Sequence, residues 1–309
     1  MPLLDEVRAE CAQIAAQARS VRIDTDALAD DELLTRLVTV APGEPEASLD
    51  PVRHYLEGEP ADVADYLLAL DAINFGSGWF PGLHKRLDRG EPVSGYFTVS
   101  WSLADHVRAH PRGEGPALGA AWLRTVDTPT IAAILEQPTD IELMSLYAQA
   151  LRQLGRFLGE RRALDLVAQC GGSAERLAQA LARGMAMWDD RHFYKRAQIL
   201  AADLALAGVA TFEDLDRLTI FADNLVPHVL RCEGVLVYDD ALAARIDAGE
   251  VLPPGGPERE IRACALHACE QISARTGVAA RVLDNRLWNR GQRPEYKARP
   301  RHRCRCVYY

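Results

Sequence analysis

The chain has 309 residues, of which 48% are hydrophobic and 26% are charged, and its formal net charge is −9. This balance is typical of a folded globular protein and excludes a disordered chain. An acidic chain lacks the basic footprint of a general nucleic-acid binder. No apolar run reaches the length that spans a bilayer, and the acidic first residues do not resemble a signal peptide. We therefore expect a cytoplasmic protein with no membrane partner, whose seven cysteines are thiols.

Helical periodicity dominates the chain, so we expect a mainly α fold in a single domain over residues 1–309, with only a few short strands. Apolar residues recur at helical spacing in residues 3–18, 60–70, 141–158, 193–204 and 261–272. Residues 94–101 carry the clearest strand pattern, because they are rich in β-branched and aromatic side chains, and residues 235–238 resemble a second strand. Thr211 and Asp214 resemble a capping box, which predicts a helix over residues 214–220. Pro257 and Gly277 mark the start and end of another helix.

Asp223 is the first candidate for chemistry. Pro227 disfavours helical backbone at the residue before it, so Asp223 and Asn224 are expected at a break between helices. A carboxylate at such a break can face a cleft while its neighbours pack in the core. The alternative is that Asp223 merely caps the next helix, a common role for aspartate, and the residues alone favour it.

Lys195 and Gln198 are three residues apart and share a stripe of one predicted helix. A lysine beside a catalytic carboxylate would keep it ionised and would attract a phosphate group. The alternative is an ordinary solvated basic face. Further along, Glu258 and Arg262 are spaced for an ion pair that stabilises a helix, whereas Glu258 and Glu260 point to different faces.

Two other groups of residues allow a functional and an ordinary interpretation. The cysteines and histidines of residues 264–269 and 302–306 are poorly spaced for zinc, so we predict no metal and favour buried thiols. Phe75 lies in a glycine-interrupted aromatic segment that would suit a planar base, although core packing is the ordinary role. Asp284, Trp288 and Asn289 fall on one helical face, where they would read a base edge or form a polar patch.

The chain contains no Walker loop, nucleophile elbow, zinc-protease helix or dinucleotide-binding glycine motif. Residues 290–309 contain seven lysines and arginines against one glutamate, which is a basic tail on an acidic body. By themselves, the residues therefore indicate a helical enzyme or binding protein with a carboxylate in a cleft.

Several separated blocks resemble, in order, those of the queuosine-salvage proteins, which are queuosine 5′-phosphate N-glycosylases/hydrolases. The resemblance extends from about residue 23 to residue 309. It rests on residues 71–75, 193–203, 221–230, 260–262, 284–289 and 302–309, and a lone family histidine matches His54. Asn224, His228 and Asn289 depart from the tyrosine, glutamine and aspartate that are usual at these positions.

The resemblance implies a fold similar to that of helical DNA glycosylases without the DNA-binding hairpin, and no cofactor. It implies that Asp223 is the catalytic carboxylate and that Lys195 assists it. For contact with the base, the resemblance implies His54, Phe221, Ala222, Asp284, Asn285 and Asn289. From the pattern of the residues we add Phe75 and Trp288. For the phosphate the candidates are Lys195, Arg196, His302 and Arg303. The substrate would be a small molecule, queuosine 5′-phosphate, rather than a nucleic-acid polymer.

Two alternatives to the hydrolase stay open. A non-catalytic carrier of queuine or its nucleotide would keep Phe221 and Asp284 but would not need an ionised Asp223. A DNA-repair glycosylase would need a basic groove and a glycine-rich hairpin for phosphates, and the net charge of −9 disfavours it.

Overall fold

The computed structural model describes residues 2–40, 48–110 and 115–309, and helices dominate it. One group of helices, which we call the terminal group, comes from both ends of the chain: α1 (Leu3–Gln17), α2 (Thr25–Ala29), α3 (Asp31–Val38), α12 (Val226–Cys232), α13 (Asp240–Asp247), α14 (Pro257–Thr276), α15 (Ala280–Arg290) and α16 (Pro294–Lys297). The other, the central group, comprises α4 (Pro60–Ala72), α5 (Gly95–Ala109), α6 (Ala120–Thr125), α7 (Thr128–Ile134), α8 (Glu142–Leu158), α9 (Ala163–Gln169), α10 (Ala174–Gly184) and α11 (Lys195–Leu206). The prediction of a mainly α fold is confirmed.

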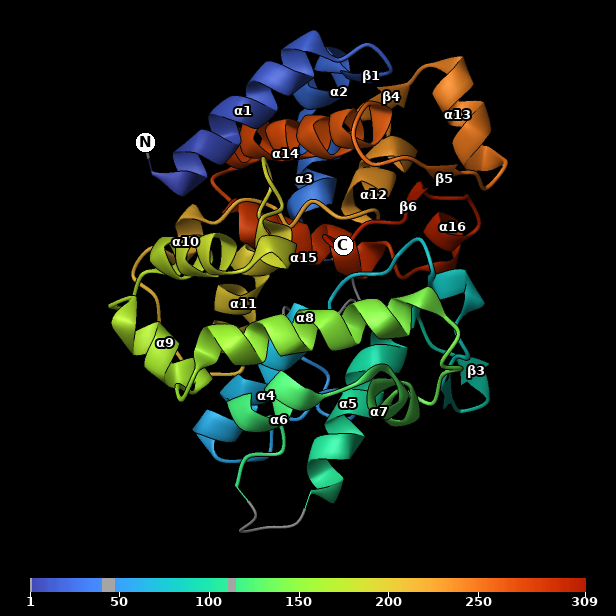
Figure 1. Ribbon diagram of the computed structural model, residues 1–309. Coiled ribbons are helices and arrows are strands. Elements are labelled where there is room, and N and C mark those ends of the chain that lie inside the picture. The colour runs from blue at the N-terminus through green and yellow to red at the C-terminus, as the bar shows by residue number, and fades with distance from the viewer. Residues whose placement is uncertain (1, 41–47, 111–114) are drawn as a thin grey trace.

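The core divides into two large clusters that follow these groups. In the terminal group α1 packs along α14, and the cluster contains Ile261, Cys264 and Leu283. In the central group α4 packs on α8 and α11, and the cluster contains Tyr66 and Leu151. Figure 1 shows α1 and α14 at the top and α8 crossing the middle above α4 to α7. Residues that join the two groups are therefore candidates for a site.

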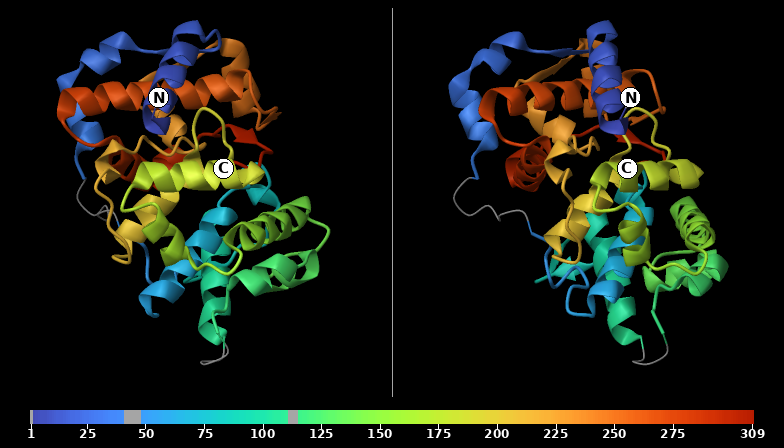
Figure 2. Two further views of the ribbon diagram at one scale, coloured as in Figure 1. Left: turned by 60° about the vertical axis from the view of Figure 1, so that its left-hand side comes forward. Right: turned by 90° about the vertical axis from the view of Figure 1, so that its left-hand side faces the viewer.

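The strands form three small sheets within the described residues. β1 (Val21–Ile23) pairs antiparallel with β4 (Leu236–Tyr238), β2 (Leu87–Asp88) pairs antiparallel with β3 (Glu91–Pro92), and β5 (Val251–Leu252) pairs parallel with β6 (Arg303–Cys304). The predicted extended segment at 235–238 is thus confirmed. The last pairing draws the tail against the terminal group, while the carbonyl oxygen of Tyr309 accepts hydrogen bonds from the backbone N–H groups of Gly76 and Ser77 in the central group. The tail therefore lies between the two groups of helices (Figure 2).

The five helices predicted from periodicity are present as α1, α4, α8, α11 and α14, and Pro257 and Gly277 bound α14 as expected. Gly277 closes that helix with a φ of 72°, a conformation that suits glycine. Each of the seven cysteines is a free thiol. Within the described residues no helix has both the length and the apolar character needed to cross a membrane.

Two local predictions are wrong. The segment predicted as a strand at residues 94–101 instead starts helix α5 at Gly95, where the Ser94 hydroxyl accepts a hydrogen bond from the backbone N–H of Phe97 and caps the helix. Packing of this segment against the core overrides the strand preference of its β-branched residues. The helix predicted over residues 214–220 is only the single turn η3 (Leu215–Arg217). The Asp214 carboxylate instead bonds the Ser173 hydroxyl and the Ala174 N–H at the start of α10.

Candidate active site

Asp223 lies in the loop of residues 218–225, which leads into α12. Its Oδ1 accepts hydrogen bonds from the backbone N–H groups of Leu225, at 2.7 Å, and Val226, at 3.0 Å. The capping role considered from the sequence is therefore real. Within the described part of the chain Oδ2 takes no hydrogen bond, and the side chain is half-buried. One oxygen thus fixes the carboxylate and the other is left for a ligand.

Three further hydrogen bonds hold this loop from three directions. The N–H of Phe221 donates to Asp284 Oδ1 at 2.8 Å, and the carbonyl of Ala222 accepts from Arg262 Nε at 2.8 Å. Asn224 Nδ2 donates to the carbonyl of His302 at 3.1 Å. Helices α15 and α14 and the C-terminal tail therefore all set the position of the carboxylate.

Arg262 connects this loop to a second one. Its Nη1 and Nη2 donate to the two carboxylate oxygens of Asp190 at 3.0 and 2.6 Å, and both side chains are buried. Asp190 in turn accepts from the backbone N–H of Lys195 at 3.2 Å. The predicted pair with Glu258 exists, at 3.7 Å, but Asp190 is the closer partner. A buried, two-pronged ion pair thereby links the Asp223 loop to the start of α11.

Lys195 lies at the first turn of α11, after Tyr194 in the left-handed conformation with φ of 49°. The residue is only 5% exposed, which excludes the solvated basic face. Its Nζ donates to the side-chain and backbone oxygens of Asn74 at 3.2 and 3.1 Å. Burial lowers the pKa of Lys195, and the carboxylates of Asp223 and Asp71 oppose that change. Its ammonium group therefore lies within electrostatic range of the Asp223 carboxylate. The Gln198 side chain, on the same stripe of the helix, forms hydrogen bonds with Thr219.

Three more acidic residues surround Lys195 and Asp223, and burial is the main reason that their pKa values rise. The pKa of Asp284 is raised to about 8 by burial and by the negative charge of Asp223. That of Asp203 is raised to about 7 by burial, against the pull of Lys195. Burial and the charge of Asp203 place the pKa of Asp71 well above its usual value. Sequence reasoning missed Asp71 and Asp203, although Asp203 follows Lys195 by about two helical turns.

An aromatic cluster forms one side of the site. The rings of Tyr96 and Phe97, on α5, meet Trp288 of α15 edge-on at centroid distances of 6.0 and 5.8 Å. His54 contacts the Tyr96 hydroxyl through Nε2 at 3.0 Å and the Asp50 carbonyl through Nδ1 at 2.9 Å. Since a carbonyl can only accept, Nδ1 carries the proton and Nε2 accepts from Tyr96. Burial lowers the pKa of His54, which favours this neutral ring.

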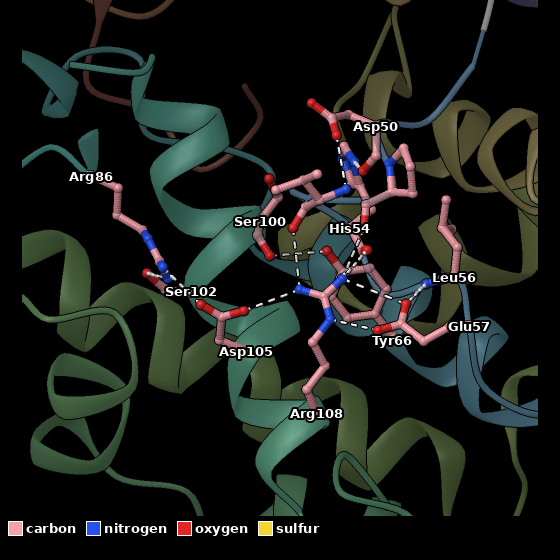
Figure 3. A network of polar contacts seen from close by, with 12 residues as sticks. Asp50, His54, Leu56, Glu57, Tyr66, Arg86, Ser100, Ser102, Asp105 and Arg108 are labelled. Atoms are coloured by element: carbon pink, nitrogen blue, oxygen red, sulfur yellow. Dashed lines mark hydrogen bonds and ion pairs between the residues drawn. The ribbon is translucent and has the colours of Figure 1, made fainter. Parts of the chain in front are cut away.

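The turn that carries His54 is fastened to α5 by Arg108 (Figure 3). Arg108 donates to the His54 carbonyl at 2.7 Å, to Glu57 at 2.6 Å and to Asp105 at 3.1 Å. The same guanidinium also reaches the carbonyls of residues 51 and 52. His54 is thus placed by a network that lies outside the aromatic cluster.

The other predicted base contacts have different surroundings. Asn289 Nδ2 donates to Asn285 Oδ1 at 3.0 Å along α15, next to Trp288. The methyl group of Ala222 is buried in the core, and its carbonyl is taken by Arg262. Phe75 is 1% exposed and packs edge-on against Tyr147 at 5.0 Å, so its ring belongs to the core as the ordinary interpretation expected.

Three of the residues predicted to contact the phosphate have surroundings that do not present a free charge to a ligand. Arg196 is 1% exposed, and its guanidinium donates only to backbone carbonyls, including those of Ala72 and Val307. His302 is buried, and burial lowers its pKa to about 3, so its ring is neutral. Arg303 lies in β6 and donates to the Gly249 carbonyl. The guanidinium groups of Arg196 and Arg303 are thus held by backbone carbonyls, whereas neither ring nitrogen of His302 takes a hydrogen bond within the described residues.

Two cavities of the described structure lie away from Asp223. One, of about 630 Å³, is lined by residues that include Tyr55, Glu59, Asp62 and Arg108. The other, of about 740 Å³, lies between α3 and the tail and is lined by residues that include Arg36 and Glu233. Among the described residues no cluster of three or more His, Cys, Asp or Glu side chains has the arrangement of a metal site. The candidate site is therefore defined by its converging polar groups.

Comparison with known proteins adds a consistent result. The sequence model of the family described as "Queuosine salvage protein" matches residues 54–309, which include every site residue described above. A Sphaerobacter thermophilus protein named queuosine 5′-phosphate N-glycosylase/hydrolase is 33% identical, over 96% of this chain and 95% of its own. Proteins of the same name from Mus musculus and Bos taurus are 31% and 30% identical, each over 83% of this chain and 85% of their own.

Proposed function

The chain belongs to the queuosine salvage protein family, and on this premise we propose that it hydrolyses the N-glycosidic bond of queuosine 5′-phosphate, releasing queuine for salvage into tRNA. The observation that carries the mechanism is Asp223, whose Oδ1 is fixed by two backbone N–H groups while Oδ2 takes no hydrogen bond within the described residues. The other product is ribose 5-phosphate, with the hydroxyl group on C1′ supplied by water.

We assign to Asp223 the stabilisation of the sugar cation. As the C–N bond breaks, its electron pair leaves with the base and positive charge develops on C1′ and the ring oxygen. A carboxylate that is held rigidly below C1′ favours this state more than the neutral substrate. A positioned group of this kind contributes about 3–4 kcal/mol. We assign to Lys195 an electrostatic role beside Asp223, because its buried ammonium lies within range of that carboxylate.

The departing base must be stabilised by hydrogen bonds from the protein. Queuine is a 7-deazaguanine, so it has no N7 that could be protonated. With a pKa of about 8, Asp284 is mostly a neutral acid at pH 7. Its Oδ1 accepts from the Phe221 N–H, which leaves Oδ2 to carry the proton and donate it in a hydrogen bond to the base. We propose that Asn285, Trp288, Asn289 and His54 contact other edges or the face of queuine.

We further propose that the two groups of helices act as one domain, because Lys195 comes from the central group and Asp284 from the terminal group. We also place the reaction in the cytoplasm, where seven free thiols are stable.

The direct test is to incubate the purified full chain with queuosine 5′-phosphate and to identify the products by mass spectrometry. The proposal predicts free queuine and ribose 5-phosphate in equal amounts, formed with many turnovers per enzyme. Stoichiometric binding of the nucleotide without cleavage would instead support the carrier. Excision from duplex DNA at low salt would support the DNA-repair alternative.

A further inference from the structure

The ammonium group of Lys195 is held by one residue, Asn74. Its Nζ donates to the backbone oxygen of Asn74 at 3.1 Å and to Oδ1 of the same residue at 3.2 Å. An ammonium has three N–H donors, and within the described residues the third has no acceptor. Because two bonds to one residue fix the direction of Nζ, they also fix where the third donor points. The side chain that we place beside Asp223 is therefore directed by the residue that lies just beyond helix α4.

Asn74 lies in a segment whose backbone is held by distant parts of the chain. The carbonyl of Phe75 accepts a hydrogen bond from the Tyr147 hydroxyl, on α8, at 2.7 Å. The N–H of Gly76 donates to the carbonyl of Tyr309, the last residue of the tail, at 2.9 Å. Contacts with α8 and with the tail thus give Asn74 the fixed position that a group needs if it is to orient another.

Asp71 sets the direction of the Asn74 amide. Since an ammonium can only donate, the side-chain atom that faces Lys195 is Oδ1, and Nδ2 donates to Asp71 Oδ1 at 3.3 Å. Asp71 is 0% exposed, and in the described structure its Oδ2 takes no hydrogen bond. A buried charge without a direct partner is unfavourable, so Oδ2 carries a proton, and burial raises the pKa of Asp71 in the same direction. A neutral Asp71 orients Asn74 without drawing the positive charge of Lys195 to itself.

We propose that Asn74 is a positioning residue for Lys195, and that Asp71 holds the Asn74 amide in the productive orientation. This inference rests on the proposed function, because it explains how the electrostatic group beside Asp223 is kept in place. The connection runs from Asp71 through Asn74 to the ammonium, and each step is a hydrogen bond of 3.1 to 3.3 Å. Electrostatic stabilisation of a transition state depends on groups that are already in position. Asn74 therefore acts on the rate of bond cleavage rather than on substrate affinity.

The first test is Asn74→Ala, assayed for release of queuine from queuosine 5′-phosphate. The variant keeps the backbone acceptor but removes Oδ1, so that the ammonium is free to swing. We expect kcat to fall about 10- to 100-fold, while KM changes by less than about twofold. The matched control, Gln13→Ala, removes an exposed amide from α1 and should leave both constants unchanged. Wild-type kcat in a folded Asn74→Ala protein, or a loss that lies in KM, would overturn the inference.

A double-mutant cycle separates positioning from a general loss of structure. If Asn74 acts through the ammonium, Asn74→Ala in a Lys195→Met background should lower the remaining kcat by less than about twofold. Effects that multiply, as they do for independent sites, would contradict this. Asp71 is tested in the same assay: Asp71→Leu should lower kcat, and Asp71→Asn, which keeps the Oδ1 acceptor, should recover most of the loss. Equal losses in the two Asp71 variants would show that the amide is not oriented in this way.

If Asn74→Ala does not fold, Asn74→Asp replaces it, because aspartate has nearly the same shape as asparagine. The new carboxylate would pair with the ammonium and weaken its action on the reacting groups, so kcat should again fall at nearly constant KM. A wild-type kcat would refute the positioning role. Failure of the wild type to release queuine would instead overturn the proposed function, whereas wild-type cleavage together with insensitive Asn74 variants overturns this inference alone.

Discussion

The Arg262 Nε donates to the carbonyl oxygen of Ala222 over 2.8 Å, and this bond joins the middle of helix α14 to the residue that precedes Asp223. The same side chain forms the two-pronged ion pair with Asp190, at the turn that precedes Lys195. One buried guanidinium therefore sets the relative positions of the two proposed catalytic groups. Its guanidinium carbon lies over the rings of Phe193 and Tyr309, at 3.9 and 4.6 Å from the ring centroids.

Replacing Arg262 with Met should both destabilise the fold and reduce turnover. The variant leaves the Asp190 carboxylate buried without its partner, which typically decreases the free energy of unfolding by about 3–5 kcal/mol. Urea denaturation followed by circular dichroism measures this change. Arg259→Met is the control, because Arg259 is exposed on the same helix. Comparable losses of stability in both variants would contradict the role given to Arg262.

The pH dependence of activity should report Asp284. Its pKa of about 8 means that it loses its proton, and with it the donor to the base, as the pH rises through that value. We expect kcat/KM to decline above about pH 8, and the Asp284→Asn variant, which is neutral at every pH, to lack this decline. If kcat/KM declined in the same way above about pH 8 in both proteins, the assignment would be refuted.

Asp284 should also make the fold less stable as the pH rises. Its folded pKa of about 8 lies above the usual aspartate value of 3.8, so between these values the folded state binds the extra proton. The stabilisation is complete below about pH 4 and is lost progressively up to about pH 8. Chemical denaturation at a series of pH values should give a steeper decline for wild type than for Asp284→Asn. Parallel curves would contradict this.

Much of the fold could be predicted from the sequence because helix signals are local. Helix α14 is an example, because its apolar spacing and its end signals, Pro257 and Gly277, all lie within one short segment of the chain. The exceptions are segments whose partners are distant. The strand preference of residues 94–101 yields to the Ser94 cap and to packing, and the Asp214 carboxylate turns back to α10, about forty residues earlier.

The site was predictable only in part for the same reason. Pro227 marked the break that exposes Asp223, but Glu258 looked like the natural partner of Arg262, and Asp190 is 72 residues away from it. Burial similarly decides that Asp203 is part of the site.

Arg108 should affect substrate binding more than the chemical step. Arg108→Gln removes the bonds that hold the turn carrying His54, so that this side of the site is no longer preorganised. We expect KM to rise about three- to tenfold, with kcat nearly unchanged, in steady-state assays of queuine release. Arg156→Gln, an exposed arginine on α8, serves as the control. A fall in kcat with constant KM would contradict the positioning role.

The central claim is that Asp223 stabilises the breaking glycosidic bond, and Asp223→Asn tests it most directly. Asparagine keeps the Oδ1 acceptor that caps α12, so the free energy of unfolding should change by less than about 1 kcal/mol. The measurement is single-turnover release of queuine from queuosine 5′-phosphate, alongside the dissociation constant of the nucleotide. The account predicts at least about a 100-fold slower release with nearly unchanged binding. Release at the wild-type rate by a folded Asp223→Asn protein would contradict it.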